Sequence, residues 1–156
     1  MNPRTHRLAV VVGIAWGLLL CAPQTSAQSV PAGLRGQIIA NAKPIKIPAS
    51  SRGFVKKLRK QDRKQFRKND QGQWQIHFVA FFRRPLPAEQ IGVVVIDDKN
   101  GPVAVANVAG SKGQTTLAAH ITVDSTETPG KPHILQVYFP KGKTPVVLAK
   151  KQIILK

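Results

Sequence analysis

Cysteine and methionine are almost absent from the 156-residue sequence, which contains one of each, Cys21 and Met1. Both fall in an N-terminal segment that we expect to be removed. The remaining chain would then have no disulfide, no thiol nucleophile and no cysteine-ligated metal, and no thioether ligand for copper. Lipid attachment at Cys21 is disfavoured because the preceding Leu20 is large. An exported domain without cysteine fits a bacterial envelope better than an animal extracellular module.

Long apolar runs are also missing. The run from Leu8 to Leu20 has about 13 residues, whereas a membrane-spanning helix needs roughly 20. Arg4 and Arg7 precede this run, and Thr25-Ser26-Ala27 follows it with the small residues of a cleavage site. We therefore predict that residues 1–27 are a cleaved signal peptide and that the protein is exported, either to the periplasm or outside the cell.

Acidic residues are scarce, with 7 Asp and Glu against 24 Lys and Arg, and a net charge of +17. Cleavage after Ala27 would remove Arg4 and Arg7, which leaves 22 basic residues, a net charge of +15 and a chain of 129 residues. That length predicts one domain. The charge predicts a partner with many negative charges. The alternative is that the charge only keeps a small domain soluble.

Catalytic motifs are absent as well. The G-x-S-x-G nucleophile turn does not occur, and Gly110-Ser111-Lys112-Gly113 fits a hairpin turn rather than an active site or a phosphate loop. Asp97-Asp98-Lys99-Asn100-Gly101 lacks calcium-loop spacing and is interpreted as a reversing turn. All seven carboxylates fall in predicted loops, turns or charged segments, which does not favour a glycosidase pair. We predict a protein that is not an enzyme and uses no cofactor.

Three histidines remain after the predicted cleavage, and each lies on a different predicted strand: His77, His120 and His133. A trihistidine metal site would require these strands to bring them together. Histidines on outward strand faces are usually solvated or paired with neighbours, so we predict no metal site. The alternation of residues around His120 predicts that its side chain faces solvent.

From Gln73 onward the sequence alternates between two sets of residues, with a period of two. Trp74, Ile76, Phe78, Ala80 and Phe82 alternate with Gln75, His77, Val79, Phe81 and Arg83, which predicts a strand with a bulky core face. The second set contains two apolar residues on the outer face. We expect them to be covered by the two halves of a sandwich or by the N-terminal segment. If exposed, they would form a protein-interaction patch.

Similar short strands follow to the end of the chain, separated by turn residues. Their predicted ranges are Ile91 to Ile96, Val103 to Val108, Thr115 to Asp124, His133 to Phe139 and Val146 to Leu155. About seven strands with short connections predict an antiparallel β-sandwich. In strand count and rhythm the pattern resembles immunoglobulin-like or fibronectin type III-like sandwiches, although the paired cysteines of immunoglobulins are absent. A small barrel is the alternative.

The segment before this domain has a different composition. Residues 28–53 are rich in proline, glycine and serine and predict an extended lead-in, with short strands at Gln37 to Ala40 and Ile45 to Ile47. Residues 54–156 are predicted to form the single sandwich domain. It would begin with a short helix near Val55 to Lys60 and a strand around Lys64 to Lys68 that enters a hairpin.

The strongest local signal is the basic segment, residues 54–68. It contains eight cations and one anion, Asp62, within 13 residues; the cations are Lys56, Lys57, Arg59, Lys60, Arg63, Lys64, Arg67 and Lys68. Such a cluster binds sulfates or phosphates by releasing counterions. Phe54, Leu58 and Phe66 lie among the charges, so insertion of an apolar side into an anionic membrane is an alternative. A solvated charged face docked on the sandwich is another.

These observations favour a non-enzymatic exported binding module. We predict that the basic segment contacts an anionic envelope component, namely lipopolysaccharide, an acidic polysaccharide or an anionic lipid. The alternative is a structural or accessory subunit of an envelope assembly that binds protein through sheet edges or apolar strand faces. Nucleic acid ranks third, because an exported protein rarely meets it.

Overall fold

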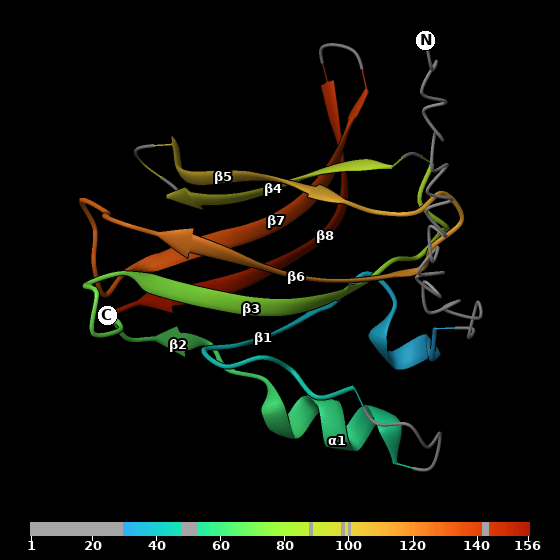
Figure 1. Ribbon diagram of the computed structural model, residues 1–156, viewed down its shortest axis with the longest axis horizontal. Helices are drawn as coiled ribbons and strands as arrows, with labels where there is room; N and C mark the ends of the chain where they lie inside the picture. Colours follow the sequence, from blue (N-terminus) through green and yellow to red (C-terminus); the bar gives the residue numbers. More distant parts are fainter. Residues whose placement is uncertain (1–29, 48–52, 88, 98, 100, 142–143) are drawn as a thin grey trace, which may run out of the picture.

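The structure is a computed structural model and describes residues 30–47, 53–87, 89–97, 99, 101–141 and 144–156 (Figure 1). The predicted signal peptide, residues 1–27, lies outside the described residues. Within the described ranges, no helix has the length and apolar character needed to cross a membrane.

Strands make up most of the described chain, with one short α-helix. In chain order the elements are the 3-10 helix η1 (Ala32–Leu34), β1 (Ile38–Asn41), α1 (Phe54–Gln61), β2 (Gln65–Phe66), β3 (Trp74–Phe81), β4 (Gln90–Asp97), β5 (Gly101–Ala109), β6 (Thr116–Val123), β7 (Pro132–Lys141) and β8 (Thr144–Leu155). The predicted helix and all the later predicted strands are present, with ends shifted by no more than two residues. The predicted strand at Gln37 to Ala40 is present as β1.

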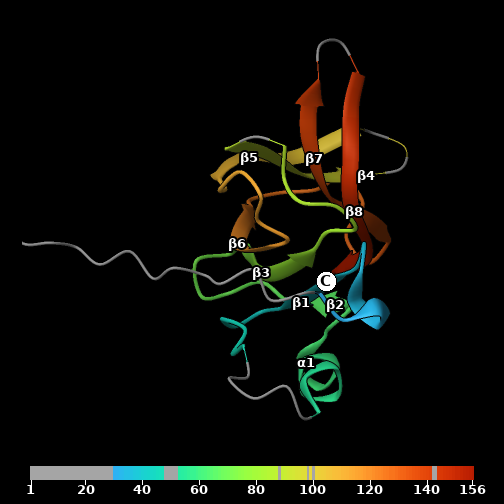
Figure 2. The same cartoon turned by 90° about the vertical axis from the view of Figure 1, so that its right-hand side faces the viewer.

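The strands form two sheets. Sheet A has three antiparallel strands in the order β1-β3-β6, and sheet B has five in the order β2-β8-β7-β4-β5. All pairs in sheet B are antiparallel except β2 with β8, which is parallel. Sheet B curls from β2 beside sheet A round to β5 on the far side (Figures 1 and 2). The predicted all-β class is confirmed, whereas the immunoglobulin-like or fibronectin type III-like arrangement stays a prediction.

The main core lies between the two sheets. The predicted inner face is confirmed, since the side chains of β3 that form it, and that of Phe82 directly after β3, are 0 to 2 % exposed and belong to this core: Trp74, Ile76, Phe78, Ala80 and Phe82. Sheet B contributes alternate residues of β4, β7 and β8, among them Val93, Leu135 and Ile153. Side chains alternate between the two faces of a strand, so the outer face of each sheet can pack against other segments of the chain.

A second apolar cluster covers the outer face of sheet A. Val79 and Phe81 of β3 are buried there against Val30, Leu34, Ile39 and Leu58. The prediction that these two residues are covered is therefore confirmed, and of the two covers that the sequence left open the N-terminal segment is the one found, with a contribution from α1. His120 lies on the same face beyond this cluster and is exposed, as predicted.

Two local predictions were wrong. No strand forms at Ile45 to Ile47. The strand before the turn at Asn69–Gly72 does not form a hairpin with β3, because β1 and β6 already occupy both sides of β3. Instead β2 pairs in parallel with the end of β8, where Gln65 lies opposite Ile154 and Phe66 opposite Leu155.

Candidate anion-binding surface

Helix α1 places its apolar side chains inward and its cations outward. Phe54, Val55 and Leu58 lie on one side of the helix, and Leu58 is fully buried in the second cluster. The residue before the helix is Gly53, whose positive φ of 69° favours a residue without a Cβ. Cations in its last turn, Arg59 and Lys60, interact favourably with the helix dipole. The helix therefore forms in spite of its repelling charges because docking stabilises it.

Asp62 anchors the end of α1 to both sheets. Its carboxylate accepts hydrogen bonds from the backbone N–H of Ala40 at 2.9 Å and from Nζ of Lys151 at 2.8 Å. The Asp62 side chain is 24 % exposed and that of Lys151 is 10 % exposed. The backbone N–H of Arg63 donates to the carbonyl of Ala40 at 2.7 Å. The one acidic residue of the basic segment is thus paired with a lysine outside that segment.

The chain before α1 is held against the helix by two side chains. Gln61 accepts from the N–H of Lys46 at 3.0 Å and donates to the carbonyl of Lys46 at 2.8 Å. Asn41 donates to the carbonyl of Gln61 at 2.7 Å. These bonds bring the segment with Lys43 and Lys46, both exposed, alongside the helix. Sequence reasoning missed these two lysines because their proximity to α1 depends on the fold.

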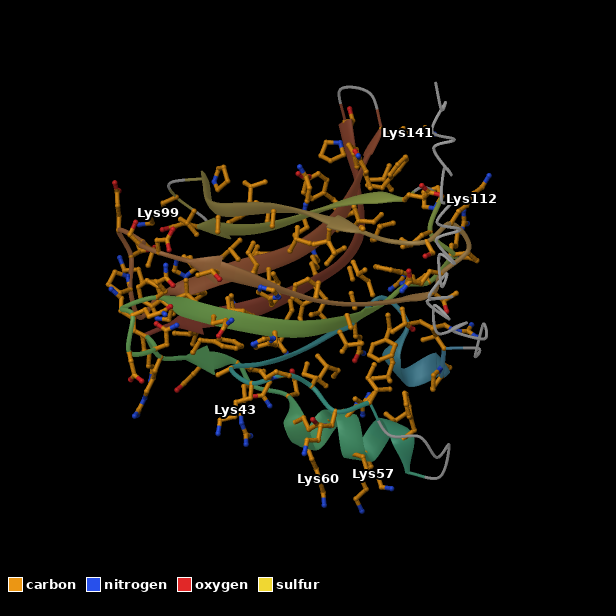
Figure 3. All side chains as sticks on the ribbon, in the orientation of Figure 1. Lys43, Lys57, Lys60, Lys99, Lys112 and Lys141 are labelled. Carbon is orange, nitrogen blue, oxygen red and sulfur yellow. The ribbon has the colours of Figure 1, made fainter. Side chains whose placement is uncertain are left out.

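All eight predicted binding residues are exposed, but they do not form one compact group. Lys56, Lys57, Arg59 and Lys60 lie on α1, Arg63 and Lys64 lie between α1 and β2, and Arg67 and Lys68 follow β2. Lys57 and Lys60 project from α1 away from the sheets, and Lys43 points in the same general direction (Figure 3). We define the cationic surface as the eight residues together with Lys43 and Lys46.

Two of these cations also make contacts within the fold. Nη2 of Arg59 donates to the carbonyl of Gly33 at 3.0 Å, and Nζ of Lys68 lies 4.5 Å from the ring centroid of Trp74. Among the described residues the only ion pair is Lys151 with Asp62, so no described carboxylate lies within 4.0 Å of any charge on the cationic surface. These charges remain available to an external anion.

An open depression lies on α1 within this site. Its lining residues are Val55, Lys56, Arg59 and Lys60, which share one side of the helix. Three cations around a partly apolar floor can hold one sulfate, phosphate or carboxylate group, with Arg59 offering a fork of N–H donors. The depression is too open to enclose a small molecule, which favours contact with successive groups of a polymer or a charged surface.

The residues that would insert into a membrane are not available. Leu58 is fully buried and Phe66 is 1 % exposed, because the first packs under α1 and the second enters the main core. Phe54 is half-buried against the second cluster. Insertion of an apolar side of this segment is therefore inconsistent with the docked helix, and contact with an anion would be made by charge at the surface.

The three histidines do not converge. His77 and His120 face each other across β3 and β6 with ring centroids 5.5 Å apart. His133 is fully buried in β7, where its ring nitrogens contact Thr126 Oγ1 at 2.8 Å and the carbonyl of Lys131 at 3.0 Å. Partial burial, and secondarily the neighbouring His120, lower the pKa of His77. Within the described residues no group of three histidine, cysteine or acidic side chains could hold a metal ion.

The predicted turn after β4 is present, because Asp97 lies opposite Gly101 in the β4–β5 pair. Asp97 is 3 % exposed; it accepts from the N–H of Lys99 at 3.0 Å and from the hydroxyl of Thr128. Its burial was missed by sequence reasoning, which placed all seven carboxylates in loops, turns or charged segments. These bonds join the turn to the loop before β7, a structural role.

No known protein-family model matches the chain, and a search of curated proteins finds no significant match.

Proposed function

We propose that the protein is an exported, non-enzymatic binding module whose cationic surface contacts an anionic component of the cell envelope. Candidate partners are lipopolysaccharide, an acidic polysaccharide or an anionic lipid headgroup layer. The observation that carries the proposal is the set of exposed cations on α1 and in the segments before and after it, with the segment's single carboxylate held by Lys151. Export is proposed from the N-terminal sequence, residues 1–27.

The binding mechanism follows from the depth at which the apolar residues lie. Because Leu58 and Phe66 support the fold, the interaction would rest on counterion release and on charge-assisted hydrogen bonds from lysine and arginine. Affinity would then fall steeply with salt concentration, and a repeating anion would bind better than a single one. A deep pocket is not needed for this type of recognition.

The test is co-sedimentation with vesicles bearing lipopolysaccharide across a salt series. The variant Lys56→Gln/Lys57→Gln/Lys60→Gln removes three charges from α1. The matched control Lys99→Gln/Lys112→Gln/Lys141→Gln removes the same charge from exposed positions away from α1 (Figure 3). We expect the α1 variant to bind more weakly and to lose about one unit of salt slope per lysine. Equal loss in both variants would mean that only net charge matters and would refute the proposed site.

The second candidate function is that of a structural or accessory subunit that binds envelope proteins. The observation that favours it is β5, an edge strand without charged residues on which Val105 is 60 % exposed. Capture experiments with the protein's own envelope extract test it. A defined protein partner whose capture is lost with changes in β5 and retained with the α1 variant would favour this candidate over the first.

We also infer an immunoglobulin-like or fibronectin type III-like arrangement. In that class one sheet carries strands A, B and E, and the other has strands G, F and C side by side. The orders β1-β3-β6 and β8-β7-β4-β5 correspond to A-B-E and G-F-C-C′. In this assignment β2 would be a continuation of the first strand that crosses to the last one. An experimental structure with a different strand order would overturn it.

A further inference from the structure

Strand β5 is a long sheet edge whose outer side has no hydrogen-bonded neighbour among the described residues. It runs over nine residues, Gly101–Ala109, and pairs only with β4. None of these nine residues is charged. Such an edge presents a row of backbone N–H and C=O groups that another strand can pair with.

The remaining edges of the two sheets are shorter or differently protected. Strand β2 has only two residues and is flanked by cations. Strand β1 has four residues, and the backbone of Ala40 is already hydrogen-bonded to Asp62 and Arg63. Strand β6 has eight residues, and its exposed side chains include His120 but no large apolar group. Proteins commonly blunt their edges by shortness, charge or covering segments. Strand β5 is neither short nor charged; β6 of the other sheet contacts it, and Pro102 lies at its beginning.

The most exposed large apolar side chain of the described residues lies at the centre of this edge. Val105 is 60 % exposed and is the fifth of the nine residues of β5. Its neighbour across the β4–β5 pair, Val94, is 7 % exposed. A valine in the middle of an unpaired, uncharged strand is suited to face an identical valine in an antiparallel pair.

We infer that β5 is a self-association edge at which two copies of the chain pair antiparallel. Val105 would face the partner's Val105, and the two five-stranded sheets would become one continuous sheet. A two-fold axis at the central residue brings Asn107 opposite the partner's Val103 and gives each copy the same contacts. The cross-strand neighbours Val94 and Val105 would then lie in line with Val105 and Val94 of the second copy.

The distribution of charge explains why a second copy is a suitable occupant. The cationic surface adjoins β2, and β5 is the opposite edge of the same sheet, four strand spacings or about 19 Å away along the sheet. Figure 1 shows α1 at the bottom of the molecule and β5 at the top. Pairing through β5 therefore keeps the two cationic surfaces apart, whereas any contact through the other edge would oppose like charges.

The pairing is independent of the proposed function but would add to it. Two cationic surfaces that face away from each other could bind two anionic groups at once, which raises avidity without new contacts. Because the pairing needs no anion, it is measured in the absence of any envelope component. A chain that does not dimerise could still bind polyanions, and a chain that does not bind polyanions could still dimerise.

The first test is the mass in solution of the chain from residue 28, which contains all described residues, over a concentration series by light scattering. Val105→Lys places two ammonium groups opposite each other at the axis, so we expect dimer formation to weaken about tenfold or more. Val147→Lys is the matched control, because Val147 is 48 % exposed on β8, away from this edge. A wild-type chain that stays monomeric at all concentrations, or a dimer equally sensitive to both variants, would overturn the proposal.

The second test reports the register directly and uses the absence of cysteine after residue 21. Cys side chains at directly opposed antiparallel positions lie about 5 Å apart between Cα atoms, within disulfide range. We expect Val105→Cys to form a covalent dimer under mild oxidation. Asn107→Cys should not, since two copies of residue 107 would lie more than about 13 Å apart. Unfolding curves confirm that each variant is folded, and equal cross-linking of both would refute this register.

Discussion

At one edge of sheet B lies β2, two residues long and surrounded by cations, while at the other lies β5, nine residues long and uncharged. Within the part of the chain that the structure describes, each of these strands has a single hydrogen-bonded neighbour. The β2 edge depends on side chains, since Phe66 is buried in the main core and Asp62 ties the preceding turn to β1 and β8. The β5 edge depends on its long backbone ladder with β4 and on small inward residues such as Ala104 and Ala106.

This difference indicates how one sheet can carry two kinds of surface. Charge and shortness protect the β2 edge against strand addition, and the same charge provides a surface for anions. The β5 edge has neither charge nor shortness, and among the described residues only β4 is hydrogen-bonded to it. Changes at the β2 edge should therefore affect folding strongly, whereas changes on the outer side of β5 should affect association.

The largest effect is expected from Phe66→Ala at the β2 edge. Phe66 is 1 % exposed and packs in the main core, so its loss should lower the free energy of unfolding by about 3–5 kcal/mol. Urea unfolding measures the change. Arg67→Ala, at the next and exposed position, should stay within about 0.5 kcal/mol. Equal effects of the two variants would contradict the view that β2 is held by this one side chain.

A smaller effect is expected from Asp62→Ala, which leaves Lys151 without its carboxylate. Because both side chains are partly exposed, the loss should be about 2 kcal/mol rather than that of a fully buried pair. Urea unfolding measures it, with Asp70→Ala in the exposed turn as the matched control. Adding Lys151→Met to Asp62→Ala should recover part of the loss, since the unpaired ammonium is then removed. A double variant no more stable than Asp62→Ala would contradict the role of the pair.

Much of the fold follows from local pattern. Alternation from Trp74 onward predicts the inner face of β3, and turn residues such as those around Gly72 separate the later strands correctly. The predicted burial of Val79 and Phe81 is confirmed as well. What fails is long-range pairing: the partner of β2 is the last strand of the chain, some 90 positions later, and no local pattern encodes that choice.

The candidate site could be predicted only as a list of exposed cations. Their solvation follows from charge, but the burial of Leu58 and Phe66 depends on surfaces supplied by the lead-in and by β8. The proximity of Lys46 to α1 depends in turn on the side chain of Gln61. The sequence spacing of Leu58 and Phe66 therefore allows membrane insertion as an alternative, whereas their burial in the fold is inconsistent with it.

The smallest effect concerns pH and is expected on sheet A, whereas β5 contains no titratable side chain. His77 lies on the outer face of sheet A beside Asn41, which bonds to the end of α1. Its pKa in the fold is below the usual 6.5, so the unfolded chain binds the proton more readily. The stability associated with neutral His77 is present above pH 6.5 and is lost as the pH falls through the lowered pKa.

His77→Gln should therefore reduce the loss of stability on acidification below pH 6.5, as measured by urea unfolding at a series of pH values. Part of the lowering comes from His120, so His120→Gln should act in the same direction and more weakly, since partial burial is the larger cause. Val105→Lys adds no group that titrates below pH 6.5 and should leave the pH dependence of the free energy of unfolding unchanged. If Val105→Lys changed the pH dependence of the free energy of unfolding, or His77→Gln did not, acid would act through groups other than His77 and His120.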